Sequence, residues 1–200
     1  MNAYILRPKA DGKNRESEFI GGRISIGWSC GESLAGKNRE EISIILAKKY
    51  SDLSEISVSM VGLFVKMPIG SIVLTPSLQD KSLIHLLRTT STYKYDPSAD
   101  NNEKGNPHFI DAEYLKTVPR SSLPKAVVRS LSGARKALSR ISQHFDLLDD
   151  FISSGFESES ETLADPTGNR AEAVNVLYDL LSSDNENVRL QAAIAIVGME

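Results

Sequence analysis

The sequence has 200 residues and a mass of 21.9 kDa, with 40% hydrophobic residues, 24% charged residues and a formal net charge of −3 at pH 7. This composition is typical of a globular protein and excludes a disordered polymer, a collagen and a coiled coil. No run reaches the roughly 18 apolar residues that a membrane-spanning helix needs, and residues 1–9 lack the apolar centre of a signal peptide. Because the single cysteine, Cys30, cannot form an internal disulfide, we expect a cytoplasmic protein without a membrane partner.

Charge is divided unevenly along the chain. Residues 146–200 contain twelve acidic and two basic residues, a formal charge of −10, whereas residues 1–145 contain 21 basic and 14 acidic residues, a formal charge of +7. The stretch 114–140 holds seven basic residues and no acidic one. A basic body with an acidic end indicates a module that binds a polyanion; the alternative is a basic helix face that only meets solvent.

Turn residues and hydrophobic periodicity predict the elements of the first half. Asp11-Gly12-Lys13-Asn14 is a turn signal within a polar, basic start of the chain. Residues 23–29 alternate apolar and small side chains, as a half-buried strand does. Residues 38–50 are predicted to be a helix, because Asn38 can cap its first turn and acidic residues follow. Residues 58–65 are apolar and fit either a helix or a strand.

Residues 71–152 contain further apolar runs, and we predict strands that end at a proline or a polar loop, followed by helices. Strands are expected at 71–76, at 83–92 with Tyr93-Lys94-Tyr95 at its end, and at 109–118, with a polar loop at 96–107 and a stop at Pro119. Leu123-Pro124 opens a helix, since proline is tolerated in a first turn. Apolar residues near helical spacing from Leu138 to Ile152 predict a second helix over 134–152.

The remaining residues change in composition. Ser, Glu, Gly, Pro and Asp dominate residues 153–169, which predicts a linker between a domain at 1–152 and a segment at 170–200. Two short apolar helices at 171–181 and 188–197 would form a helical hairpin that resembles one unit of a HEAT-type repeat. Because a solenoid needs about three units to bury a core, this hairpin would dock on the body, pair with another chain or belong to a longer array.

A series of short motifs runs in order through the body of the chain. These motifs are Ile24-Ser25-Ile26-Gly27-Trp28, Met67-Pro68-Ile69-Gly70-Ser71-Ile72-Val73, Thr92-Tyr93-Lys94-Tyr95-Asp96, His108, and the segment from Ala112 to Pro124. In order and spacing they resemble the EVE/PUA-like N-terminal specificity domains of modification-dependent, Mrr-type restriction endonucleases, over roughly residues 20–145. Ser71 stands where that family usually has Asp, and Tyr114 where it usually has Trp; both departures bear on the ligand rather than on the fold.

The resemblance implies an α+β fold, a PUA-like small β-barrel with flanking helices, followed here by the C-terminal helical hairpin. It also implies a cleft that takes up a flipped, modified base of DNA. Such a cleft needs aromatic faces, polar groups for the base edge and cations for phosphates. The expected residues are Trp28, Tyr93 and Tyr95 for stacking, Ser29 and His108 for the base edge, and Lys94, Arg120 and the basic residues of 125–140, such as Lys125 and Arg129, for phosphates. The alternative for Trp28 and one tyrosine is a place in the core of the barrel.

Motifs that would carry catalysis are missing from the sequence. There is no Walker loop and no Gly-x-Ser-x-Gly elbow, and the acid-x-Lys pattern of restriction nucleases occurs only in the polar stretch Asp11-Gly12-Lys13. Cys30 has no histidine near it in sequence, and one cysteine with three scattered histidines does not make a structural zinc site. We therefore expect no catalytic residue, no cofactor and no metal.

The leading interpretation is a reader module without enzymatic activity of its own, which recognises a modified base in DNA as the specificity part of a restriction or antiviral defence system. The acidic residues 146–200 would dock a nuclease or NTPase subunit, or a second copy of the chain. Two alternatives stay open. One is a protein-interaction component of such a system that has lost base binding, and the other is the N-terminal part of a restriction endonuclease whose catalytic domain follows residue 200.

Overall fold

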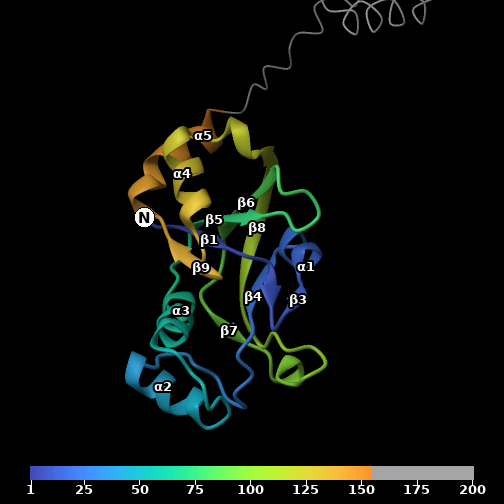
Figure 1. The fold of residues 1–200 in the computed structure, drawn as a ribbon, viewed down its shortest axis with the longest axis vertical. Coiled ribbons are helices and arrows are strands. Elements are labelled where there is room, and N and C mark those ends of the chain that lie inside the picture. Colours follow the sequence, from blue (N-terminus) through green and yellow to red (C-terminus); the bar gives the residue numbers. More distant parts are fainter. Residues whose placement is uncertain (155–200) are drawn as a thin grey trace, which may run out of the picture. The chain divides into compact units, whose positions relative to one another are not determined.

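A mixed, seven-stranded sheet organises residues 1–154, the part of the chain that the computed structural model describes (Figure 1). The strand order is β4-β8-β6-β5-β1-β9, and β7 also pairs with β8. The strands are β1 (Ala3–Leu6), β4 (Arg23–Ile26), β5 (Ile72–Pro76), β6 (Leu83–Thr89), β7 (Lys94–Tyr95), β8 (His108–Pro119) and β9 (Leu138–Arg140). Only the β1–β5 pair is parallel among these strands. A separate hairpin pairs β2 (Lys9–Ala10) with β3 (Lys13–Asn14), around the predicted turn at Asp11-Gly12.

The long strand β8 curves the sheet into a half-barrel. Its first residues, 108–111, pair with β4, and residues 112–119 pair with β6. The pairing with β6 slips by one residue between Leu86 and Leu87, which lie opposite Lys116 and Tyr114. Such a bulge increases the local twist and bends the strand. One strand therefore belongs to two differently oriented parts of the sheet.

Strand β1 was not predicted from the sequence. All four of its residues, Ala3-Tyr4-Ile5-Leu6, are buried, because β5 and β9 flank the strand and side chains cover both of its faces. A strand covered on both faces has a continuous apolar run instead of the alternation that marks a half-buried strand. The polar residues that follow β1 hide this short run further.

Two of the helices, α2 and α3, begin at a side-chain cap. In α2 (Arg39–Ala47), the Asn38 side chain accepts from the amide of Glu41, whose carboxylate accepts from the amide of Asn38. This capping box confirms the predicted helix. Residues 58–65, which fitted either element, belong to α3 (Glu55–Val65), which Ser54 caps. The other helices are α1 (Glu16–Ile20), α4 (Lys125–Gly133) and α5 (Phe145–Ser153), with 3₁₀ turns η1 (Pro97–Ala99), η2 (Arg120–Ser122) and η3 (Ser142–His144).

The predicted helix over residues 134–152 is wrong in its first half. The segment contains β9, the turn η3 and only then α5. Leu138 and Arg140 lie opposite Leu6 and Tyr4 of β1 in an antiparallel pair. The apolar spacing from Leu138 onward also suits a helix, but here pairing with the edge of β1 satisfies the backbone of this segment. The predicted strand 83–92 is also shorter, and Lys94–Tyr95 forms the separate strand β7.

Alternation along the strands divides the core between the two faces of the sheet. Ala3 and Ile5 face a cluster that includes Val127 of α4 and Leu148 of α5. Tyr4 and Leu6 face the other way, toward a cluster closed by α1 and α3, and a further apolar cluster lies between α2 and α3. Helices thus flank a curved sheet on both faces, and the α+β fold class is confirmed.

The chain divides into two units, Met1–Ser153 and Ser154–Glu200, and the description concerns the first. Apart from its first two residues, the predicted linker at 153–169 lies outside the described residues, as does the predicted hairpin at 170–200. Within residues 1–154, no helix combines the length and the apolar character that crossing a membrane requires.

Candidate functional site

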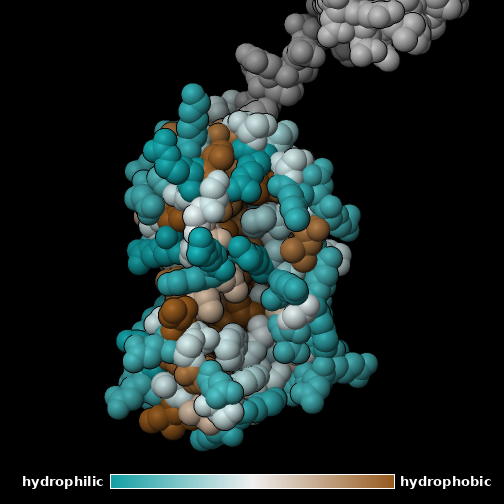
Figure 2. Space-filling view, viewed as in Figure 1, coloured by the Kyte–Doolittle hydropathy of each residue, from teal (hydrophilic) through white to brown (hydrophobic). Residues whose placement is uncertain are grey.

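A cavity of about 330 Å³ lies on the face of the sheet to which Leu6 points. Its lining comes from the end of β1, the β2–β3 hairpin, β4 with the residues after it, α3, and the segment that leads into β9. The face drawn in Figure 2 is hollowed across its middle, between the regions that Figure 1 labels β9 and α3. The cavity therefore lies where elements far apart in the sequence meet.

Two aromatic rings form one side of this cavity. Trp28 follows β4 and Tyr50 follows α2, and both line the cavity and are half-buried. Their ring centroids lie 5.0 Å apart with an interplanar angle of 70°, an edge-to-face arrangement. The hydroxyl of Tyr50 donates to the carbonyl of Ser29 at 3.1 Å, which holds this ring against the segment that carries Trp28. The two rings therefore support each other in the lining of the cavity.

The backbone of Trp28 is in an unusual conformation. Its φ angle is +74°, in the left-handed region that a bulky side chain rarely occupies. Nε2 of His108 donates to the carbonyl oxygen of Trp28 at 3.0 Å. A strained conformation persists only where its surroundings hold it, and such positions cluster at binding sites. His108 is therefore a positioning residue for Trp28.

His108 is fully buried, with 0% of its surface exposed, and it belongs to a chain of hydrogen bonds. The backbone amide of Leu34 donates to the hydroxyl of Tyr93 at 3.0 Å, and this hydroxyl donates to Nδ1 of His108 at 2.7 Å. Since Nε2 donates to Trp28, this arrangement requires the neutral ring with its proton on Nε2. Burial lowers the pKa of His108, although the bond to Trp28 and the charge of Asp100 oppose the shift.

Asp100 fixes the turn that follows Trp28. Its Oδ2 accepts from the amide of Gly31 and from the hydroxyl of Tyr95, each at 2.7 Å. Burial would raise the pKa of Asp100, but the hydrogen bonds from Tyr95, Gly31 and Ser29 outweigh it, so the pKa lies below its usual value. Burial and the bond to Asp100 raise the pKa of Tyr95, whose ring lies 5.6 Å from that of His108. Tyr93, Tyr95 and His108 thus form a supporting layer behind Trp28.

The hairpin side of the cavity carries polar groups. Asp11, at the tip of the β2–β3 hairpin, lines the cavity together with the hydroxyl-bearing Ser25 of β4. Asn106 donates to the Ser25 hydroxyl at 3.2 Å. The turn at Asp11 packs closely on Gly27, where an added Cβ would lie 3.0 Å from the amide nitrogen of Asp11. An acidic residue of the hairpin turn and a serine of β4 therefore belong to the lining of the cavity.

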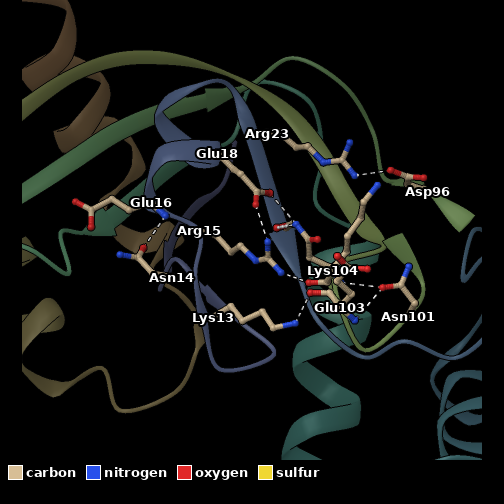
Figure 3. A network of polar contacts seen from close by, with 12 residues as sticks. Lys13, Asn14, Arg15, Glu16, Glu18, Arg23, Asp96, Asn101, Glu103 and Lys104 are labelled. Carbon is tan, nitrogen blue, oxygen red and sulfur yellow. Dashed lines mark hydrogen bonds and ion pairs between the residues drawn. The ribbon is translucent and has the colours of Figure 1, made fainter. Parts of the chain in front are cut away.

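The polar loop 96–107 holds this hairpin in place (Figure 3). Lys13 donates to the carbonyls of Asn102 and Glu103, and Arg15 donates to the carbonyl of Lys104. Gly105, with a φ of +70°, lies against the carboxylate of Asp11, and a Cβ there would collide with it. The loop and the hairpin form one tied unit.

Two cations lie at the rim of the cavity. Arg7 follows β1 and donates to the carbonyl of Ala134 at 2.8 Å, and Lys9 is an exposed residue of β2. Neither forms an ion pair with a carboxylate of residues 1–154. Their charges are therefore available to an anionic ligand.

The structure places most of the predicted site residues elsewhere. Of the nine, all within the described residues, Trp28 is the only one that lines the cavity. Ser29 is buried, and Lys94 pairs with Asp111 on the surface of β8. Arg120 donates to Ser132 at 3.0 Å, and Lys125 and Arg129 are exposed on α4, the helix that covers the opposite face of the sheet from Leu6.

Sequence reasoning missed five polar or aromatic residues that line the cavity: Arg7, Lys9, Asp11, Ser25 and Tyr50. Ser25 belongs to the motif Ile24–Trp28. A polar residue in a strand of otherwise apolar alternation is a signal that could have identified it as a site residue. Tyr50 belonged to the predicted helix 38–50, but nothing in its local sequence shows that its ring meets Trp28. The contact depends on how the helix pair packs on β4.

A second polar cluster lies apart from the cavity, beneath α1. Glu16 and His85 are both buried, and Nε2 of His85 lies 2.8 Å from Oε1 of Glu16. The same carboxylate accepts from Ser77 at 2.5 Å and from the amide of Leu78 at 2.9 Å. Burial would raise the pKa of Glu16, but these hydrogen bonds outweigh it and lower the pKa. Nδ1 of His85 lies 2.6 Å from the hydroxyl of Thr117, so the cluster ties α1 to β6 and β8.

Cys30 lies near a histidine without forming a catalytic pair. Its Sγ is 3.7 Å from Nε2 of His108, whose proton goes to the carbonyl of Trp28. The thiol donates to the carbonyl of Glu32 at 3.2 Å, and burial raises its pKa. A thiol with a raised pKa is a poor nucleophile. Within residues 1–154, no group of three or more His, Cys, Asp or Glu side chains is arranged to hold a metal ion.

No protein-family model matches the sequence. No curated protein matches it either. The solved structures that match the chain include protein Atu2648 from Agrobacterium tumefaciens, with a TM-score of 0.38 and 11% identity, and the human THYN1 protein in a complex with DNA that contains 5-methylcytosine, with a TM-score of 0.37 and 10% identity. The first alignment covers 78% of this chain and 94% of the other, and the second covers 79% and 99%.

Proposed function

We propose that this chain is a nucleic-acid-binding module that takes an extruded nucleobase into the cavity beside Trp28. The observation that carries the proposal is the combination of an aromatic side, two polar groups and two cations without an ion pair around one cavity. Its volume of about 330 Å³ lies at the lower end of the range of small-ligand sites. A single base with its sugar suits a cavity of this size better than a larger cofactor does.

Each part of a nucleotide has a partner at this site. The indole of Trp28 can stack on the inserted base. The carboxylate of Asp11 accepts hydrogen bonds from the amino groups of bases, and the hydroxyl of Ser25 can donate or accept. Arg7 and Lys9 supply positive charge for the neighbouring phosphates.

We further propose that the ligand is DNA with a modified cytosine. The support is the resemblance of the motifs between Ile24 and Pro124 to the specificity domains of modification-dependent restriction proteins. A carboxylate at the cavity favours cytosine, whose N4 amino group is a donor, over thymine, which presents a carbonyl at the same position. In this proposal the chain is the reader of a restriction or defence system, and a nuclease or NTPase subunit acts beside it.

The test compares the full chain with its Trp28→Ala variant on labelled DNA duplexes. The duplexes differ in one position, which holds cytosine, 5-methylcytosine or 5-hydroxymethylcytosine. We expect the parent to bind the duplex with a modified base more tightly than the duplex with cytosine. In the variant the ratio of these two affinities should fall by about tenfold, the scale of one lost stacking contact. A Lys9→Ala variant should weaken all three duplexes alike, because phosphate contacts carry no base identity.

The matched control is Tyr114→Ala, which removes a partly exposed ring from β8 outside the cavity. It should leave base preference unchanged. A Trp28→Ala protein that stays folded by circular dichroism and keeps the parent's preference would show that the base does not enter this cavity.

A further inference from the structure

The cavity beside Trp28 adjoins further hollows that the proposed base does not fill. A second hollow of about 360 Å³ shares Met60 and Leu138 with the cavity and lies between α3 and the segment that joins α4 to β9. A third hollow of about 380 Å³ shares Ser59, Leu63 and Arg140 with the second. The three hollows therefore adjoin one another along α3, and together they are called the groove; part of it can be followed between the labels β9 and α3 when Figures 1 and 2 are compared.

The groove beyond the cavity is lined by cations and by no acidic residue. Arg135, Lys136 and Arg140 line the second hollow, and Arg39 and Lys66 join Arg140 in the third. Among residues 1–154, only Arg39 of these five forms an ion pair, with the exposed Glu55 at 3.2 Å. Four positive charges thus stand along the groove without a carboxylate partner in the described part of the chain, which favours an anionic occupant.

The side chains of the groove suit a sugar–phosphate backbone rather than stacked bases. Its apolar lining consists mainly of aliphatic and small residues such as Ile56, Leu63 and Ala134. No aromatic ring lines the second hollow, and the aromatic residue in the lining of the third, Tyr4, is buried. Arg140 is held in position by hydrogen bonds to Asn2 and Ser142. Aromatic side chains bind nucleic acid by stacking on its bases, whereas cations bind its phosphates. A groove with cations and aliphatic side chains therefore suits the sugar–phosphate backbone.

The charge of the lining changes where the groove ends. The third hollow shares Arg39 and Val58 with a further hollow whose lining includes Glu40 and Glu55. These carboxylates would repel a polyanion and mark the end of its path. A bounded cationic groove that begins at the base cavity is the shape that one flanking strand requires.

We infer that the strand which supplies the extruded base continues along α3, with its phosphates at Arg135, Lys136 and Arg140. This inference rests on the proposed function, because the strand enters the groove from the nucleotide held beside Trp28. The sequence expectation assigned phosphates to Lys94, Arg120 and the basic residues of 125–140. We keep Arg135, Lys136 and Arg140 from that range and leave out Lys125 and Arg129, which are exposed on α4.

The experiment measures binding of single-stranded oligodeoxynucleotides of about 12 and about 3 nucleotides, each with a central 5-methylcytosine, to the full chain and to two double variants. Arg135→Ala/Lys136→Ala removes two exposed groove cations, and Lys125→Ala/Arg129→Ala removes two exposed cations of α4. We expect the groove variant to bind the longer strand about tenfold more weakly and the shorter one within about twofold of the parent. The slope of log affinity against log salt should become less steep by about 1.4, from about 0.7 per lost phosphate contact.

The α4 variant is the matched control and should bind both strands as the parent does. A groove variant that keeps full affinity for the longer strand, or an α4 variant that loses as much affinity, would overturn the inference. Failure of the cavity proposal has a different signature, since Trp28→Ala would then keep base discrimination whatever the effect of strand length.

Discussion

The two buried histidines of this domain, His108 and His85, have similar exposure and opposite surroundings. His108 lies between a backbone carbonyl and a phenol hydroxyl, and its pKa is lowered by burial. His85 lies against the carboxylate of Glu16, which also accepts from a hydroxyl and an amide. The first holds one residue of the candidate site, and the second fastens a helix to the sheet. The partners of a buried histidine, more than its burial, therefore decide what the residue does.

The region around His85 should dominate stability. In a His85→Ala variant the buried carboxylate of Glu16 loses one of its donors, and a small cavity remains. We expect a loss of about 3 kcal/mol in the free energy of unfolding, measured by urea denaturation, because bonds to charged groups are among the stronger ones and their buried partners cannot find water. Base preference should be unchanged, since neither residue lines the cavity.

Glu16→Gln is the matched control for this prediction. It keeps the shape of the side chain and one acceptor, so its loss should be smaller than that of His85→Ala. If His85→Ala costs less than about 1 kcal/mol, the cluster beneath α1 does not stabilise the domain as its geometry indicates.

The region around His108 should affect the site more than the stability. Tyr93→Phe removes the hydroxyl that joins the Leu34 amide to Nδ1 of His108. We expect a loss of about 1.5 kcal/mol, since two buried polar groups lose their partner, together with weaker discrimination between cytosine and 5-methylcytosine. The second effect arises because a loosened His108 no longer fixes the carbonyl of Trp28.

Tyr114→Phe is the control here, since its hydroxyl bonds to Thr117 at a partly exposed position. It should change the free energy of unfolding by less than about 0.5 kcal/mol. A Tyr93→Phe variant that is destabilised but discriminates bases like the parent would show that the supporting layer stabilises the domain without affecting base binding in the cavity.

The smallest effect expected is on the pH dependence of stability. The pKa of His108 lies below 6.5 in the folded protein, so between that pKa and about 6.5 the unfolded chain binds a proton that the folded one does not. Stability should therefore fall as pH decreases below about 6.5, by at most about 1.4 kcal/mol per pH unit from this residue. Glu16, whose pKa is lowered, contributes stability that is lost only at more acidic pH.

Denaturation of the parent and of His108→Asn at several pH values between about 5 and 7.5 tests this sign. Only the slopes are compared, because the substitution also removes hydrogen bonds. The variant should show a flatter dependence. An equal slope in both proteins would mean that His108 does not remain neutral in the folded state over this range.

Local signals predicted many of the elements of this fold. Asn38 and Glu41 form the cap at the start of α2. Pro76 and Pro119 end strands, and Asp11-Gly12 forms the expected turn. These features depend on residues a few positions apart. Strands β1 and β9 were not predicted. The sequence of β1 is apolar without alternation, and β9 is defined by its pairing with β1, which lies more than a hundred residues away in the chain.

The candidate site was harder to predict for the same reason. Trp28, Tyr93, Tyr95 and His108 do come together, joined by hydrogen bonds and ring contacts. Their chemistry does not tell which ring faces the cavity and which supports it from behind. Tyr50 and the rim cations reach the cavity through the packing of α2, α3 and the first hairpin, which no local pattern encodes.

The contact between Gly105 and Asp11 has a consequence for how fast a ligand binds and leaves. Because Gly105 has no side chain, the loop packs directly against the hairpin. This packing fixes the positions of Lys9 and Asp11 before a ligand binds. Such preorganisation leaves little chain motion to be frozen on association. Substitutions in this cavity should then change the residence time of the ligand far more than its rate of arrival.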